Sequence, residues 1–467
     1  MTQQDTIQAP SVLDRKAEVG ATFSLAWPMI MTMVAVILME TVDMLMIGHL
    51  GQDAIAAAAL ALNAWFIFLL FGIGTLGAVS SLTAQAVAQN DDRGVRRSAR
   101  QGLWIGLMMG TPFALILQYG ETAFILLGQD PVISHAAQGY LNWMAPVLII
   151  VFVTIPLRLT MASYGVTRPA MLFAWSGVPL NALLNWVFMF GGLGFPAMGL
   201  PGAGLATFVV DIYILVLAVL YINFTPKFAK LQLFVRFWRP DWPRFRQMLS
   251  IGLPSGGSWV MEHGLFGATA IMMGWVGVTQ LAAHQIALQV MSITFMVPFG
   301  LSQAATIRIA LAAGARDLAA VRLRGRVILE TTLVFMLGCA ILFWTVGYVF
   351  IGLFLSDDDP NRAQIIAYGA TFLAVGALFQ LFDGVQITAG GILRGLNDTL
   401  VPMVLAFLGY WVVGIGGAYV MGFVLGYGGV GVWYGLMIGL GFCAIAVTLR
   451  FWRQTGPKGS AFHRIRG

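Results

Sequence analysis

Charged side chains are scarce in this sequence of 467 residues. Asp, Glu, Lys and Arg make up 10% of it, where soluble proteins average about 25%, and hydrophobic residues make up 59%. A soluble protein of this length could not cover its surface with so few charges, so much of the surface must face lipid. The composition therefore excludes a water-soluble fold and predicts an all-α integral membrane protein.

Cysteine and several enzyme motifs are also rare or missing. The two cysteines, Cys339 and Cys443, lie in apolar stretches, which indicates neither a disulfide framework nor a zinc site. The sequence contains no Walker lysine loop, no HExxH and no DDxxD motif, which argues against ATP hydrolysis and against an intramembrane enzyme. We expect no cofactor, no use of ATP and no nucleic-acid partner, and we expect the chain to function as a monomer in the lipid bilayer.

Long apolar stretches are abundant. A helix of about 20 residues crosses about 30 Å of hydrocarbon. Twelve stretches meet this requirement: 23–46, 54–85, 101–120, 138–159, 169–191, 199–222, 248–275, 280–306, 327–350, 364–390, 401–425 and 429–451. The first is too long for a removable signal peptide and lacks the small-residue cleavage site that such a peptide needs. We therefore interpret it as the first membrane span.

The basic residues indicate the orientation. If the N-terminus is cytoplasmic, all but one of the 26 Lys and Arg residues fall on the cytoplasmic side, and the exception is Arg362. Cytoplasmic loops of membrane proteins carry such an excess of positive charge. We predict twelve transmembrane helices in a cell inner membrane, with both termini in the cytoplasm.

The two halves of the chain repeat at an offset of 226 residues. The offset aligns Pro28 with Pro254, Gly48 with Gly274, Gly51 with Gly277, Asp91 with Asp317, Arg96 with Arg322, and Arg100 with Arg326. Such repetition is typical of duplicated transporters. It predicts two pseudo-twofold-related six-helix bundles. We place an N-terminal segment at 1–22, an N-lobe at 23–222, a basic cytoplasmic linker at 223–247, a C-lobe at 248–451 and a cytoplasmic tail at 452–467.

A few acidic residues remain inside the predicted spans. They are Glu40, Asp43, Asp211, Glu262 and Asp383, with Glu330 about one turn from a cytoplasmic edge. Each needs a partner, a water-filled cavity or a proton, because an ionised group is expensive in hydrocarbon. These acids also break the internal repeat, since the offset places Asp43 on Thr269 and Glu262 on Val36. Residues that serve the shared scaffold should recur in both halves, so we predict separate tasks for the acids of the two lobes.

Helical spacing groups some of these residues. Glu40 and Asp43 are three residues apart and share a helix face, where two like charges raise one another's pKa and make at least one a candidate proton carrier. Asn181 and Asn185 are one turn apart and could orient a carboxylate or a cation. Asp383 has Gln380 and Gln386 on its side of the helix, whereas Asp211 and Glu330 have no polar neighbours on theirs and receive no role.

Several of these residues carry a family resemblance. The run from Glu40 to Gly51, ETVDMLMIGHLG, resembles the first-span signature of the MATE (multidrug and toxic compound extrusion) transporters. Three further stretches are similar to the NorM branch of that family: Pro254 to Glu262, Pro179 to Trp186, and Asp383 to Asp398. The resemblance covers essentially the whole chain and implies cation-driven drug antiport.

The resemblance also implies roles for single residues. It makes Asp43, Asn181 and Asn185 an N-lobe coupling site, and Glu262 and Asp383 a C-lobe cation site that is a candidate for Na⁺. The chain departs from some sodium-coupled members at Phe379, where they have Tyr, and this removes an oxygen from the C-lobe site. The resemblance therefore leaves H⁺ and Na⁺ open as the coupling ion.

We predict a secondary antiporter that exports cationic amphipathic drugs and xenobiotics by alternating access. Carboxylates supply charge to such compounds, aromatic rings supply cation–π attraction, and the 24 Met residues adapt to varied shapes. One alternative is a flippase for lipid-linked oligosaccharides. It should show Lys or Arg inside the spans, whereas no Lys lies inside a predicted span and the few Arg near span ends lie at cytoplasmic edges. A passive channel fits a two-lobed repeat poorly.

Overall fold

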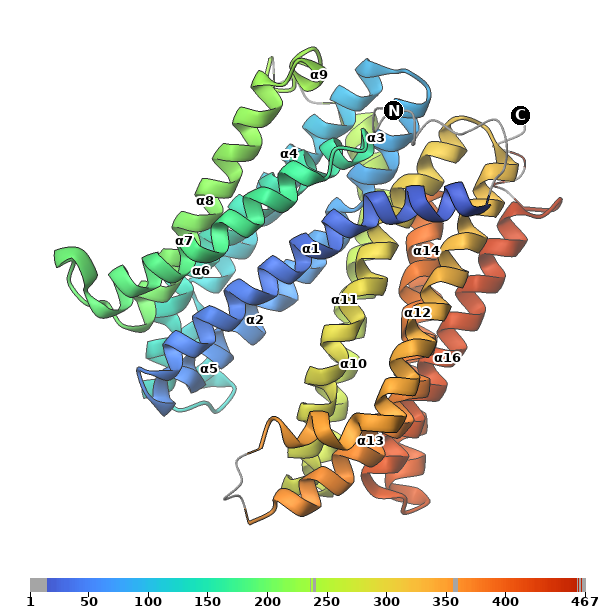
Figure 1. The fold of residues 1–467 in the computed structure, drawn as a ribbon. Helices are drawn as coiled ribbons and strands as arrows, with labels where there is room; N and C mark the ends of the chain where they lie inside the picture. The colour runs from blue at the N-terminus through green and yellow to red at the C-terminus, as the bar shows by residue number, and fades with distance from the viewer. Residues whose placement is uncertain are drawn as a thin grey trace. The chain divides into compact units, whose positions relative to one another are not determined.

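The structure, a computed structural model, describes residues 15–235, 237, 241–355, 360–459, 461 and 463. Throughout these residues the chain is helical and contains no strand, as Figure 1 shows. Most of the predicted N-terminal segment 1–22, part of the linker 223–247 and the end of the tail lie outside the described residues. The prediction of an all-α fold is confirmed.

The helices form two compact units, Trp27–Gly256 (unit 2) and Met1–Ala26 with Gly257–Gly467 (unit 1). The helices that lie wholly in unit 2 are α2 (Gln52–Leu76), α3 (Ala78–Ala88), α4 (Asp92–Leu117), α5 (Gly120–Leu126), α6 (Pro131–Ser163), α7 (Arg168–Phe190), the 3₁₀ turn Gly192–Gly194, α8 (Leu200–Phe224) and α9 (Pro226–Ala229). Those that lie wholly in unit 1 are α11 (Val278–Gly314), α12 (Leu318–Gly352), α13 (Arg362–Gly395), α14 (Leu400–Phe407), α15 (Gly416–Tyr419) and α16 (Gly428–Thr455), with π-helical segments at Leu408–Ile415 and Val420–Val424.

Two helices pass from one unit into the other. The helix α1 (Arg15–Gly48) begins in unit 1 and continues into unit 2, whereas α10 (Trp242–Val276) begins in unit 2 and continues into unit 1. Each therefore starts among helices of the opposite half of the sequence. Hydropathy cannot reveal such an exchange, because it reports where a span lies and not which helices it packs against.

Every predicted span coincides with a helical run. Ten runs of the described chain are long and apolar enough to cross a membrane, and α4 with α5, which meet at a bend of 55°, make an eleventh if counted as one span. The remaining predicted span, 248–275, lies in α10, which is long enough at 35 residues but contains Glu262 and His263. These charged and polar side chains lower its hydropathy below that of the other spans.

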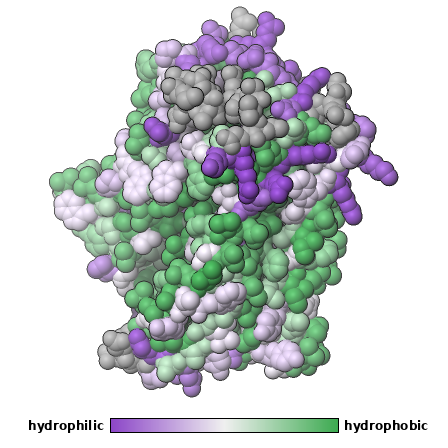
Figure 2. All heavy atoms as spheres, turned by 45° about the vertical axis from the view of Figure 1, so that its right-hand side comes forward, coloured by the Kyte–Doolittle hydropathy of each residue, from purple (hydrophilic) through white to green (hydrophobic). Residues whose placement is uncertain are grey.

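The outward faces of the helices suit a lipid environment. Many large hydrophobic side chains are exposed, among them Leu45 at 65% and Val334 at 72% of their full accessible area. Figure 2 shows hydrophobic side chains over much of the face in view. Water would make such a surface unfavourable, whereas lipid tails match it.

Both units begin an equivalent helix in the same way. The Asp91 carboxylate accepts a hydrogen bond of 2.9 Å from the Gly94 amide at the start of α4, and Asp317 accepts one of 2.9 Å from the Ala320 amide at the start of α12. Such N-caps satisfy amides that have no partner within the helix. The residue before each cap has a positive φ, 53° at one and 59° at the other. The predicted repeat thus recurs as shared backbone geometry.

One helix occupies a central place in each unit. In unit 2, α6 packs against α2, α4 and α8, and in unit 1, α13 packs against α11, α12 and α16. Glycines permit the closest approaches, since a Cβ at Gly106 would lie 2.3 Å from the Phe152 carbonyl oxygen and one at Gly391 would lie 2.4 Å from that of Ser302. Small residues at helix crossings are typical of membrane proteins.

Polar side chains fix the start of each exchanged helix. In unit 1, the Glu18 carboxylate on α1 accepts hydrogen bonds from Arg308 on α11 and, at 3.3 Å, from Arg324 on α12. All three are at least 95% buried, and Arg324 also donates to the Arg308 carbonyl oxygen at 3.0 Å. We call these three residues the unit 1 clasp.

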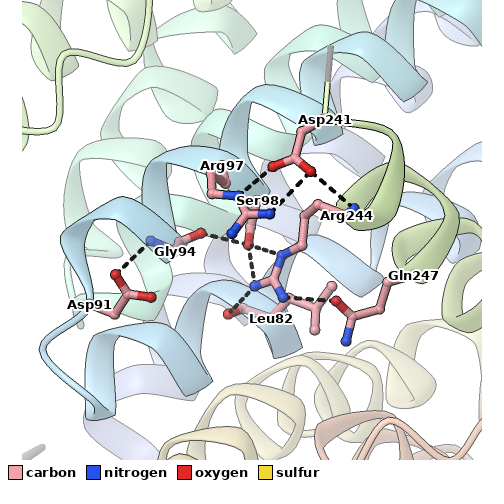
Figure 3. A network of polar contacts seen from close by, with 8 residues as sticks. All are labelled: Leu82, Asp91, Gly94, Arg97, Ser98, Asp241, Arg244 and Gln247. Carbon is pink, nitrogen blue, oxygen red and sulfur yellow. Dashed lines mark hydrogen bonds and ion pairs between the residues drawn. The ribbon is translucent and has the colours of Figure 1, made fainter. Parts of the chain in front are cut away.

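The corresponding contact in unit 2 involves one arginine. Figure 3 shows the Arg244 guanidinium of α10 between α3 and α4, where it donates to the Ser98 hydroxyl at 2.6 and 2.9 Å and to the Leu82 carbonyl at 3.4 Å. We call Arg244, Ser98 and Leu82 the unit 2 clasp. Next to it, Arg97 pairs with Asp241, just before α10 begins.

Candidate functional site

A polar cluster surrounds Asp43 inside unit 2. Its carboxylate accepts a hydrogen bond of 2.5 Å from the Asn185 amide and one of 3.2 Å from the Thr207 hydroxyl. The Asn185 amide also donates to the Asn181 carbonyl oxygen at 3.2 Å. Three helices, α1, α7 and α8, therefore converge on one buried carboxylate, which is only 8% exposed. The structure brings Asp43, Asn181 and Asn185 together, as the family resemblance implied.

Glu40 lies beside this cluster but in a different environment. It is one turn before Asp43 on the same face of α1, and it is exposed to the space of a cavity. No hydrogen bond joins it to another of the described residues. The two acids thus differ in a useful way, because Asp43 is held in place by donors while Glu40 stays free to meet a ligand.

The cavity lies entirely within unit 2. Its volume is about 200 Å³, counted as the space that the centre of a water-sized molecule can occupy, and it is partly open to the surroundings. Its polar lining includes Glu40, Asp43, Asn181, Thr207 and Asp211, and its apolar lining is rich in Met and aromatic side chains, among them Met33, Met39, Met144, Trp65, Phe66 and Phe173. An apolar pocket with a few convergent polar groups is the usual form of a small-molecule site.

Arg158 also lines this cavity, which the sequence had not indicated. Arg158 lies on α6, near the end of the helix, lines the cavity and interacts electrostatically with Asp211 on α8. Position along a span does not show which face of the helix a side chain occupies, so this cavity-lining place was not predictable. That the end of the span near Arg158 lies at the cytoplasmic edge stays a prediction. The expectation that Asp211 has no polar neighbour on its helix face is wrong, because Thr207 lies one turn before it on α8, and Arg158 acts on it from another helix.

A second polar cluster lies in unit 1. The Tyr410 hydroxyl donates to the Glu262 carboxylate at 3.2 Å, and the Gln386 amide donates to the Tyr410 oxygen at 2.6 Å. Tyr410 belongs to the π-helical segment Leu408–Ile415, and such segments are frequent at functional sites. Asp383, one turn from Gln386 on α13, is near enough to Glu262 for the two carboxylates to repel one another.

Several buried atoms of the unit 1 cluster lack partners. Among the described residues, one Asp383 oxygen, the Gln386 oxygen and the Gln380 amide nitrogen make no hydrogen bond, although all three side chains are more than 90% buried. The Gln380 oxygen accepts a bond of 3.1 Å from Thr294. The Asp383 and Gln386 oxygens are groups that can bind water or a cation, and the Gln380 nitrogen can only donate a hydrogen bond.

Glu330 lies apart from both clusters. It forms an ion pair of 2.7 Å with Arg15 and one of 2.8 Å with Arg326, and about a third of its side chain is exposed. The expectation that Glu330 has no polar neighbour on its helix face is therefore wrong, because Arg326 lies one turn before it on α12, and Arg15 of α1 is a second partner. A role in binding does not follow from these contacts.

Two residues of the clusters gave no signal in the sequence. Thr207 and Tyr410 carry neutral hydroxyls, which are common in membrane helices and so do not stand out as the acids do. One spacing hint existed, because Thr207 precedes Asp211 by one helical turn. Nothing along the chain connects Tyr410 to Glu262, since 148 positions separate them.

The described residues contain no group of three or more His, Cys, Asp and Glu side chains arranged to hold a metal ion. A site for Na⁺ at Glu262 and Asp383 would therefore depend on neutral oxygens as well. Tyr410 and the glutamines of α13 offer such oxygens. The Na⁺ site stays a prediction.

Helices long and apolar enough to span a membrane, with an acid-lined cavity among those of unit 2, are the arrangement of a multi-pass membrane transporter. Comparison with known proteins identifies the kind. The MatE family model matches residues 28–187 and 254–420, and the two segments begin at the prolines that the internal repeat pairs. The chain therefore belongs to the MatE family: it is a MATE transporter and not an enzyme.

Curated relatives agree with this assignment. The chain is 39% identical over 451 residues to "Probable multidrug resistance protein NorM" of Mesorhizobium japonicum, covering 96% of each chain. It is 40% identical to a protein of the same name from Rhodopseudomonas palustris, over 94% of this chain and 93% of the relative. The predicted resemblance to NorM-like MATE transporters is confirmed.

Solved structures share the fold. The eukaryotic MATE transporter AtDTX14 matches with a TM-score of 0.85 at 19% identity, over 97% of this chain and 99% of that one. The outward-facing conformation of a multidrug resistance MATE family transporter of the MOP superfamily matches with a TM-score of 0.85 at 19% identity, over 97% and 98%. At this identity the likeness concerns the fold alone.

Proposed function

We propose that the chain exports cationic, amphipathic drugs in exchange for H⁺ or Na⁺ through alternating access. The observation that carries this proposal is the cavity of unit 2, in which Glu40 and Asp43 face Met and aromatic side chains. A lipophilic cation gains from both kinds of lining, from carboxylates by charge and from ring faces by cation–π attraction. The names of the NorM relatives, as multidrug resistance proteins, support the same substrate class.

Competition for the carboxylates couples the two fluxes. A proton or Na⁺ that reaches the acids from outside removes negative charge from the cavity, and the drug is released there. When the cation leaves on the inner side, the freed carboxylates attract the next drug. Because a ligand shifts a conformational equilibrium only through its different affinity for the two states, the ion and the drug must favour opposite states. Each charge that moves inward releases about 2.3 kcal/mol per 100 mV.

The residue roles follow from the two clusters. In unit 2, Asn185 and Thr207 hold the Asp43 carboxylate toward the cavity, and Glu40 offers a second negative charge to the drug. In unit 1, Glu262 and Asp383 form the second coupling site, where the Tyr410 hydroxyl is a candidate for the oxygen missing at Phe379. We place these sites in an N-lobe (23–222) and a C-lobe (248–451), with both termini in the cytoplasm of a cell whose inner membrane holds the protein as a monomer.

Transport in proteoliposomes tests the proposal. Ethidium movement is measured under a proton gradient alone and a sodium gradient alone, for the unaltered protein and for the variants Asp43→Asn and Asp383→Asn. We expect each variant to lose at least about tenfold in ion-driven transport, the scale of one lost charge-assisted interaction. Asp53→Asn serves as the matched control, since Asp53 is an exposed acid at the start of α2. Unchanged transport in both variants would overturn the coupling assignment.

The same assay separates the flippase alternative. A carrier of anionic pyrophosphate lipids should be insensitive to the loss of a negative charge at Asp43. The presence of Arg158 on the cavity wall weakens the earlier argument against such a carrier, because a basic side chain does lie within a membrane helix. Ethidium-driven counterflow of Na⁺ or H⁺ would favour the antiporter, whereas movement of a fluorescent lipid without an ion gradient would favour the flippase.

A further inference from the structure

The cavity of unit 2 has a basic group in an otherwise acidic lining. Of the residues that line it, Arg158 is the one Lys, Arg or His. Within the described part of the chain, its guanidinium forms no hydrogen bond and no ion pair within 4 Å, although Asp211 acts on it electrostatically. An arginine has five N–H donors in a planar fork, and it is expensive to hold in a membrane unless they are satisfied.

Asp211 on α8 is linked electrostatically both to Arg158 and to Asp43. Thr207, which donates to Asp43, and Asp211, which interacts with Arg158, are four residues apart on the same face of that helix. A rise of 1.5 Å per residue separates them by about 6 Å. The polar lining therefore has an acidic level at Asp43 and Glu40, with Asp211 one turn further along α8, and a basic level at Arg158 on α6, fourteen residues after the lining residue Met144.

Most of the remaining lining is apolar. Val36 and Met33 continue the face of α1 beyond Glu40, and Trp65 and Phe173 also contribute to the lining. A flat aromatic compound fits against such a wall, with one polar end at each level. An oxygen acceptor on the compound would satisfy the unbonded guanidinium, and a carboxylate would do so in a bidentate manner.

We propose that Arg158 is a specificity-determining residue that binds the carboxylate or another oxygen acceptor of dipolar substrates whose cationic end lies near Glu40 and Asp43. The inference rests on the proposed function, since it assigns part of the same cavity. Asp211 balances the guanidinium while the cavity is empty, and it gives way to the stronger, directly bonded acceptor of the substrate. Purely cationic compounds use the acidic level alone.

Two dyes that differ in one group test this proposal. Rhodamine 123 is a methyl ester with a net positive charge, and rhodamine 110 is the corresponding free acid, a zwitterion at neutral pH. Their binding to the purified protein in nanodiscs is measured by fluorescence anisotropy, and their export is measured in proteoliposomes. For Arg158→Gln we expect rhodamine 110 to bind at least about tenfold more weakly, the loss of one charge-assisted contact, while rhodamine 123 changes by less than about threefold. Arg158→Lys keeps the charge without the fork and should fall between.

Further variants make the result unambiguous. Arg168→Gln removes an exposed arginine at the start of α7, outside the cavity lining, and should leave both dyes unaffected. Asp211→Asn removes the balancing acid and should tighten rhodamine 110, and it keeps the proposal open to test if Arg158→Gln does not fold. Equal changes for both dyes in Arg158→Gln, or weaker binding of rhodamine 110 in Asp211→Asn, would overturn the inference. If the unaltered protein binds neither dye, the proposed function fails instead.

Discussion

The unit 1 clasp is a buried ion-pair triad, whereas the unit 2 clasp joins one arginine to neutral acceptors (Figure 3). The residues of the two clasps pair at the offset of 226 positions: Glu18 with Arg244, Arg308 with Leu82, and Arg324 with Ser98. Both hold the first turns of an exchanged helix against an equivalent helix pair, α11 with α12 or α3 with α4. The clasp thus holds the exchanged helix in both units, although the residue on that helix is acidic in unit 1 (Glu18) and basic in unit 2 (Arg244).

The two clasps also share one hydrogen bond, from a guanidinium to a backbone carbonyl. In both clasps a guanidinium donates to the backbone carbonyl at the same position of the repeat. In unit 1 Arg324 donates to the Arg308 carbonyl at 3.0 Å, and in unit 2 Arg244 donates to the Leu82 carbonyl at 3.4 Å. The arginine comes from the second helix of the pair in one unit and from the exchanged helix in the other. A guanidinium thus lies at this place in both units, while the charges around it differ.

The largest effect is expected at Glu18. Replacing it with Gln leaves Arg308 and Arg324 buried without a counter-charge, and breaking a buried ion pair by removing one partner destabilises by about 3–5 kcal/mol. Arg244→Gln loses hydrogen bonds from a charged donor to neutral acceptors, about 1.5–3 kcal/mol, but leaves no charge buried without a partner. Thermal unfolding of the purified protein should therefore show a larger drop in midpoint for Glu18→Gln. Equal drops would contradict the contrast between the clasps.

A transplant tests whether the two clasps are equivalent. Glu18→Arg alone places three arginines together and should be at least as destabilising as Glu18→Gln. Adding Arg308→Leu and Arg324→Ser recreates the unit 2 set in unit 1, and we expect it to recover about 2–3 kcal/mol of the loss, most of the unpaired-charge penalty. The unfolding midpoint measures this recovery. No recovery in the triple variant would mean that the equivalence in sequence is not an equivalence in packing.

The N-caps, in contrast, carry the same residue, an aspartate, in both units. Asp91→Ala and Asp317→Ala should each destabilise by about 1 kcal/mol, because each removes one cap from an equivalent helix. The two losses should agree within about 0.5 kcal/mol and add in the double variant. Asn at either position retains an acceptor oxygen and serves as the control. If only one of the two variants lost stability, the two caps would not contribute equally to the start of their helices.

The sequence predicted the shared scaffold better than the points where the units differ. Long apolar runs located the helices, and the positions of Gly, Pro and Asp revealed the repeat, because hydropathy and backbone geometry are local properties. The exchange of α1 and α10 between units was not predictable, since it depends on packing between distant segments. The reversal of the clasps was visible as unlike residues at the offset, but only contacts show that Glu18 and Arg244 perform the same task.

The sequence predicted the acidic residues of the candidate site, because charged side chains are rare in membrane spans. Asp43 and Asp383 stood out for that reason, and the amides of α7 stood out through their spacing. Thr207 was missed because a neutral hydroxyl can satisfy itself by bonding its own helix, as Thr207 also does with the Ala203 carbonyl at 3.2 Å. The place of Arg158 on the cavity wall could not be predicted, because nothing in its position along the chain shows which side of α6 it occupies.

The smallest effect concerns the ion pair beside the unit 2 clasp. Asp241 lies just before α10, and hydrogen bonding by Arg97 is the main reason that its pKa is held below the ordinary value of 3.8. The offset places Asp241 at the position of Arg15, which pairs with Glu330 at 2.7 Å, so the charge is reversed here as well. Both pairs are partly exposed and are weakened by salt.

The pH dependence of this pair has a definite sign. Because the pKa of Asp241 is lower in the folded protein than in the unfolded chain, its stabilising contribution is complete above about pH 4 and is lost as the pH falls through the folded-state pKa. Asp241→Asn should therefore lower the unfolding midpoint slightly at neutral pH, less than loss of an N-cap does, and the gap to the unaltered protein should close in acid. Arg97→Gln should give the same pattern, since it removes the cause of the shift. A gap that persists in acid, or that high salt leaves unchanged, would assign Asp241 to the N-terminal turn of α10 through its 3.3 Å bond to the Arg244 amide, and not to the ion pair.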